Sequence, residues 1–200
     1  MSKEISVRLE FIEEVLGTQS NNKEVQAEYI SSKAPNAETL EEEVAAVGVD
    51  ATIEKGKLVF PRDVNGKPFL YDYQIRGFFK DACSVLRVVP KTKSSDLKAY
   101  KKYIDGLIFV HPRKIVLNMP KGVLVGSCQR PLRGQTAQGE RISLANSETC
   151  PATTWCEFKI KVLREDFEDA VIEWLDYGCL KGIGGWRNSS KGIFTYKLIQ

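Results

Sequence analysis

Apolar and polar residues alternate along three segments of the chain, which is the pattern of a half-buried β-strand. The segments are 5–12, 155–162 and 193–199. In the first, Ile5, Val7, Leu9 and Phe11 alternate with polar side chains. Shorter apolar runs predict further strands at 107–110, 114–117 and 123–127, with a break at Pro112.

Helical spacing of apolar residues predicts an amphipathic helix from Asp72, its N-cap, to about Val88, before Pro90. A lysine-rich helix is expected over 95–104. Another is expected over 165–177, with Gly178 at its C′ position. A short helix over 37–47 and turns at Lys55-Gly56 and Asn65-Gly66 complete the pattern. The segment 128–146 has little apolar periodicity and is predicted to be an exposed loop.

The order of these elements is strand, insertion, helix, strand, strand, helix, strand. Two βαβ-like halves of this kind predict an α+β fold, namely a ferredoxin-like (RRM-like) antiparallel sheet with two helices on one face. We expect a single domain over residues 1–200, with insertions at about 17–69 and 118–141.

Charge is distributed unevenly along the chain. Residues 1–75 have a net charge of −6 and residues 142–200 of −1. Residues 76–141 hold 14 basic and four acidic residues, a net charge of +10. A block this basic suggests a polyanionic partner, although a solvated surface also accounts for it.

Several classes of protein are not expected. No apolar run approaches the roughly 18 residues of a membrane-spanning helix, and Met1–Glu4 leads into no signal-peptide core. We therefore expect a cytoplasmic protein without membrane contact. No Walker-type motif indicates nucleotide hydrolysis. No Cys-x-x-Cys pair indicates a metal site, so we expect neither metal nor cofactor; the cysteines are Cys83, Cys128, Cys150, Cys156 and Cys179.

Residues 178–196 combine five glycines with cations and a tryptophan. Glycine lets the backbone approach a partner closely, and consecutive N–H groups in such a loop can bind an anion. Arg187, Lys191 and Trp186 would add charge and a stacking surface suited to a sugar-phosphate backbone. The alternative is a helix-to-strand connection that needs glycine only to turn.

Three stretches resemble the RAMP superfamily, the ferredoxin-like RNA-binding subunits of CRISPR effector complexes. Residues 73–87 resemble its first-helix motif, without the family's proline and serine pair. Residues 147–158 resemble its Pro-Ala-Gly-Thr turn, with Thr153 in place of glycine. The stretches 182–187 and 191–194 resemble its glycine-rich loop. The size and insertions of the chain also resemble stand-alone proteins of phages or prophages.

The resemblance implies binding of single-stranded RNA, and it places candidate residues in three groups. The glycine-rich loop offers Lys181, Gly184, Gly185, Trp186, Arg187 and Lys191. The first helix offers Arg76 and Lys80. A thumb-like extension offers Arg130, Arg133, Gln135, Gln138 and Arg141. A phage-encoded protein of this kind would act on host CRISPR defence by mimicking a subunit or capturing guide RNA. Assembly with a CRISPR effector complex, or of copies side by side, is also implied.

Catalysis is less favoured by the sequence. The single histidine, His111, lies in Val110-His111-Pro112-Arg113 and is a weak candidate for a general acid or base. A structural histidine at a strand kink is the simpler interpretation. Two alternatives to non-catalytic RNA binding stay open: a metal-independent endoribonuclease that uses His111, and an interaction module that docks on a partner complex without nucleic acid.

Overall fold

The computed structural model describes residues 2–21, 56–136 and 139–199. The predicted helix over 37–47 lies outside these residues. The described chain divides into two compact units. Unit 1 comprises 1–15, 61–124 and 150–200, and unit 2 comprises 16–60 and 125–149. Both helices and strands are present, so the predicted α+β class is confirmed.

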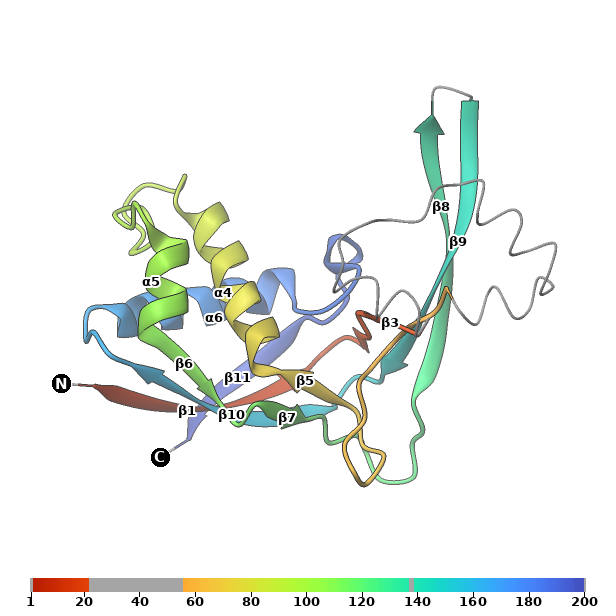
Figure 1. Cartoon of the computed structure of the whole chain (residues 1–200), viewed down its shortest axis with the longest axis horizontal. Helices are drawn as coiled ribbons and strands as arrows, with labels where there is room; N and C mark the ends of the chain where they lie inside the picture. Colours follow the sequence, from red (N-terminus) through yellow and green to blue (C-terminus); the bar gives the residue numbers. More distant parts are fainter. Residues whose placement is uncertain (1, 22–55, 137–138, 200) are drawn as a thin grey trace. The chain divides into compact units, whose positions relative to one another are not determined.

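Unit 1 contains a four-stranded sheet with the spatial order β11-β1-β10-β6 (Figure 1). Its strands are β1 (Lys3–Phe11), β6 (Ile108–His111), β10 (Trp155–Val162) and β11 (Phe194–Ile199). Every neighbouring pair is antiparallel. The strand predicted over 155–162 matches β10, and those predicted over 5–12 and 193–199 match β1 and β11 within two residues.

Three of the described helices lie on one face of this sheet, rather than the two predicted (Figure 1). They are α4 (Asp72–Leu86), α5 (Tyr100–Leu107) and α6 (Phe167–Lys181). The helices bury the apolar face of the sheet, including Val7, Leu9, Ile160 and Phe194. Polar residues at alternate strand positions face away from this core. Strands β5 (Phe69–Tyr71) and β7 (Lys114–Val116) pair as a two-stranded sheet. In the chain, β5 directly precedes α4, and β7 follows β6.

The predicted cap of the first helix was wrong by one residue. The N-cap is Tyr71, whose N–H donates to the Gln74 side chain at 2.7 Å. Asp72 is the first helical residue and pairs with Arg76 one turn later. The second predicted helix, over 95–104, begins later than expected, at Tyr100. The residues before it form turns, in which buried Ser94 bonds to Glu173 and Trp174.

The predicted end of the last helix was also wrong, because α6 continues through Gly178 to Lys181. Gly178 is a packing residue. A Cβ at this position would lie 2.3 Å from the Phe194 ring and 2.7 Å from the Phe78 ring. The helix ends at Gly182, whose φ of +79° favours glycine.

Unit 2 contains a second sheet with the order β2-β9-β4-β3, in which β8 also pairs with β9. The strands are β2 (Val15–Leu16), β3 (Gln19–Ser20), β4 (Leu58–Val59), β8 (Gly126–Thr136) and β9 (Gly139–Cys150). The loop predicted over 128–146 was therefore wrong, since β8 and β9 form a long antiparallel hairpin (Figure 1). A two-stranded hairpin pairs through its backbone, so its sequence does not need alternating apolar residues.

No helix within the described residues is long and apolar enough to cross a membrane.

Candidate nucleic-acid interface

The glycine-rich loop joins α6 to β11 and has a defined backbone. The N–H of Ile183 donates to the carbonyl of Gly192 at 3.0 Å, so the two ends of the loop meet. A Cβ on Gly192 would lie 1.9 Å from the Ile183 carbonyl oxygen. Gly184 also has a positive φ, of 92°. Glycine at 182 and 192 therefore closes the loop, and Gly184 turns the segment between them.

Between these ends, the loop makes one short helical turn. Trp186 is half-buried in the left-handed region, and the 3-10 helix η1 (Arg187–Ser189) follows it. Gly184 and Gly185 are also partly exposed. The backbone here is within reach of a ligand, and the indole of Trp186 is only partly covered.

Each of the three predicted loop cations has a partner within the protein. Arg187 Nη1 lies 2.6 Å from an Asp81 carboxylate oxygen, and Lys191 Nζ lies 2.5 Å from a Glu14 carboxylate oxygen. Lys181 Nζ donates to the Asn188 amide oxygen at 2.5 Å. The first two pairs fix the loop against α4 and the segment that follows β1.

The two cations predicted on the first helix are paired in the same way. Arg76 Nη2 lies 3.0 Å from Asp72, and Lys80 Nζ lies 2.5 Å from Asp105 on α5. Asp81, the partner of Arg187, directly follows Lys80 in the chain. The fold therefore brings the glycine-rich loop and α4 together, and carboxylates lie among their cations.

The cations predicted on the thumb-like extension are placed by the hairpin of unit 2. Arg130 lies opposite Ala145, Arg133 opposite Ile142, and Arg141 opposite Gly134. Gln135 lies opposite Glu140, whereas Gln138 lies outside the described residues. Arg133 and Arg141 are thus one register step apart near the end of the hairpin.

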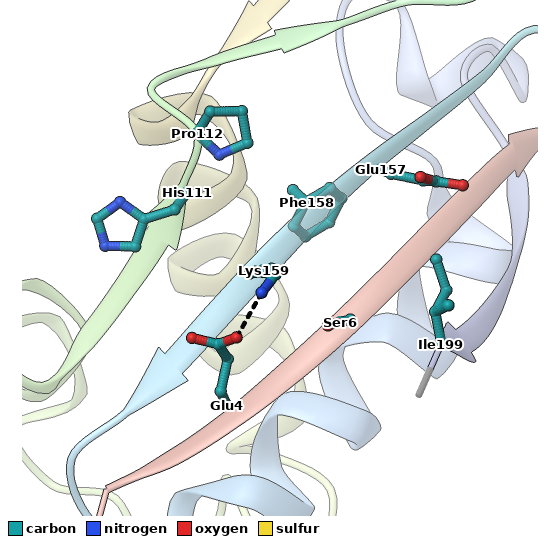
Figure 2. A pocket seen from close by; sticks show the side chains of 8 residues that line it. All are labelled: Glu4, Ser6, His111, Pro112, Glu157, Phe158, Lys159 and Ile199. Carbon is teal, nitrogen blue, oxygen red and sulfur yellow. Dashed lines mark hydrogen bonds and ion pairs between the residues drawn. The ribbon is translucent and has the colours of Figure 1, made fainter.

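His111 is exposed at the end of β6, where a cis peptide bond joins it to Pro112. It lies directly opposite Lys159 of β10. Both residues line a hollow of about 730 Å³ on the open face of the sheet (Figure 2). Glu4 lines the same hollow, and its carboxylate accepts a hydrogen bond from Lys159 at 2.7 Å, which lowers its pKa.

This open sheet face was not among the sites predicted from the sequence. A signal was present, because most of the polar positions of β1 and β10 on this face are charged: Glu4, Arg8, Glu10, Glu157, Lys159 and Lys161. Such residues are ordinary on a solvated strand, so strand pairing was needed to show that Glu4, Glu157 and Lys159 line one hollow with His111. Among the described residues, no group of three or more His, Cys, Asp or Glu side chains is placed to hold a metal ion.

No protein-family model matches the sequence, and no curated protein matches it. A solved structure does match: a chain in the cryo-EM structure of the Type III-B Cmr-beta bound to cognate target RNA, with a TM-score of 0.59 and 10% sequence identity. The likeness is one of fold. It covers 100% of this chain and 61% of that chain, so this chain spans less than two thirds of its neighbour's length. At the level of fold, it agrees with the RAMP resemblance of the sequence.

Proposed function

We propose that this protein is a non-catalytic RNA-binding protein with a RAMP-like, ferredoxin-like fold. The strand order β11-β1-β10-β6, antiparallel throughout, supports this arrangement. Helix α4 lies in sequence between β1 and β6, and α6 lies between β10 and β11. This order supports the split βαβ connectivity proposed for a ferredoxin-like sheet. The two-stranded β5–β7 sheet and the strands of unit 2 are additions to it.

The observation that carries the proposal is the fold likeness to a chain in the target-RNA-bound Cmr-beta structure. RNA is the ligand named for that assembly, and the glycine-rich loop beside α4 offers backbone and cations for a phosphate chain. A CRISPR effector complex is the corresponding partner. Mimicry of a subunit by a phage protein, capture of guide RNA, and side-by-side assembly of copies remain predictions.

RNA phosphate would compete with the carboxylates for the loop cations. Arg187, Lys191 and their partners are partly exposed, with side-chain exposures between 24% and 41%. Exposed ion pairs contribute about 0–1 kcal/mol each, because water and salt screen them. Several phosphates that bind together would therefore replace these pairs at small cost.

The hairpin of unit 2 would contribute separately, as an arm whose arginines contact the RNA backbone. Arg130, Arg133 and Arg141 are its contributors. Arginine binds phosphate in a bidentate manner, which suits contacts that do not depend on base identity.

Fluorescence anisotropy with single-stranded RNA, single-stranded DNA and duplex DNA tests the proposal, at about 50 mM and about 200 mM salt. We expect RNA binding that weakens steeply at the higher salt, without cleavage of the RNA. Absence of RNA binding at low salt would contradict it. A nuclease-resistant protein complex would then favour the alternative of an interaction module. Cleavage that the variant His111→Ala abolishes would favour the endoribonuclease alternative.

A further inference from the structure

The open face of the four-stranded sheet holds the hollow described above, on the side away from the helices (Figure 2). Strand register arranges the residues of this open face, those of the hollow and their neighbours, in three rows. His111, Lys159, Ser6 and Ile199 form the central row. Glu4 and Lys161 lie in one flanking row, and Glu157, Arg8 and Lys197 lie in the other.

Carboxylates and neutral surfaces within the hollow disfavour a phosphate there. Glu4 and Glu157 both line it and would repel an anion. The same carboxylates accept hydrogen bonds, whereas Pro112, Ile199 and the His111 ring offer surfaces for a flat group. The hollow therefore suits a flat ligand with amino donors at its edge.

Glu157 is the carboxylate better placed to accept new hydrogen bonds. Its side chain is 46% exposed, and the nearest Arg8 nitrogen lies 3.4 Å from its oxygen. The Arg8 guanidinium also lies over the Trp155 ring, 4.0 Å from its centroid. Glu4, in contrast, is held by Lys159 at 2.7 Å. A carboxylate has about four acceptor positions, so one long contact leaves Glu157 able to bind a ligand.

Cations that do not line the hollow lie in both flanking rows of this face. Lys161 is directly opposite Glu4, and Lys197 is directly opposite Arg8. Standard strand spacings put these two lysines on the order of 16 Å apart along a diagonal of the sheet. Phosphates on either side of a bound nucleotide would find complementary charge there.

We propose that this hollow binds an unstacked nucleobase that carries an exocyclic amine, within single-stranded RNA. Glu157 accepts the amine, His111 contacts the base, and Lys161 and Lys197 contact neighbouring phosphates. This inference rests on the proposed RNA-binding function and adds base selectivity to it. Single-stranded RNA is commonly read in this way, by stacking and by hydrogen bonds to base edges.

Oligocytidine and oligouridine of equal length test the proposal. Cytosine presents an amine where uracil presents a carbonyl oxygen, and the two bases are otherwise similar in size. We expect the wild-type protein to bind oligocytidine about tenfold more tightly in anisotropy titrations. In Glu157→Gln, the preference should fall to within about twofold, because an amide both donates and accepts.

Glu10→Gln is the matched control. Glu10, on β1, lies on the same face of the sheet as Glu157 but does not line the hollow. It should keep the wild-type preference. Equal binding of both oligonucleotides by the wild-type protein would overturn this inference while the proposed RNA binding stands. An unchanged preference in Glu157→Gln would overturn it as well, provided that this variant unfolds at the same temperature as the wild-type protein. Absence of binding to either oligonucleotide would overturn both proposals.

Discussion

The Arg187 guanidinium lies 2.6 Å from the Asp81 carboxylate, although the two residues are 106 positions apart in the sequence. This pair ties the glycine-rich loop to α4. It also places a carboxylate where an RNA phosphate would bind. Asp81 therefore acts in two ways: it positions the loop, and it competes with a polyanion for the same cation.

Asp81→Asn should raise RNA affinity by about two- to fivefold at low salt, because it frees Arg187 and removes a repulsive charge. The free energy of unfolding should fall by less than about 1 kcal/mol, since both side chains are partly exposed. Anisotropy and urea unfolding measure the two effects. Asp169→Asn, which frees Lys93 near the opposite end of α6, is the control and should leave RNA affinity unchanged. A lower affinity in Asp81→Asn would show that positioning of the loop dominates.

Gly178→Ala should destabilise the protein by about 1–3 kcal/mol, because its Cβ would overlap the Phe194 and Phe78 rings. This loss should exceed the gain of about 1 kcal/mol in helix propensity. Gly77→Ala in α4 is the matched control, since no heavy atom lies within 4 Å of its added Cβ. Gly77→Ala should raise the urea midpoint. Equal shifts for the two variants would contradict the packing role of Gly178.

Alkaline pH should destabilise the fold through Cys156. Complete burial raises the pKa of this thiol from 9.0 to about 12. The folded state therefore favours the protonated thiol, so the stabilisation is complete below about pH 9 and is lost as the pH rises toward 12. Urea unfolding at about pH 8 and about pH 11 gives the decrease in the free energy of unfolding between these two pH values. This decrease should be smaller for Cys156→Ala than for the wild-type protein. Equal decreases would contradict this prediction.

The main strands of unit 1 could be predicted from the sequence because the apolar–polar alternation of each strand lies within a few consecutive residues. Alternating apolar residues at Ile5–Phe11 are buried on one face of β1, as expected. The amphipathic helix that becomes α4 is equally local. The hairpin of β8 and β9 was not predictable in this way, because backbone pairing between distant residues forms it.

In the candidate site, too, some features follow from the local sequence and others depend on contacts between distant residues. The positions of Arg187 and Lys191 in a glycine-rich loop could be predicted from composition and motif. Their carboxylate partners, Asp81 and Glu14, are far away in the sequence and became apparent only through the fold. The pairing of His111 with Lys159 likewise depends on strand register. Gly178 was misassigned because glycine both ends helices and allows close packing, and only the position of Phe194 distinguishes the two roles.

The most direct test of the central claim compares the salt dependence of RNA binding in two double variants. Arg187→Ala/Lys191→Ala removes two loop cations. Lys93→Ala/Arg164→Ala removes two exposed, ion-paired cations near the start of α6. The slope of log K against log salt is negative. If the loop contacts two phosphates, the first variant should reduce the magnitude of this slope by about 1.4, and the second should leave it unchanged. Equal slopes for wild type and both variants would show that the glycine-rich loop is not the RNA-binding surface.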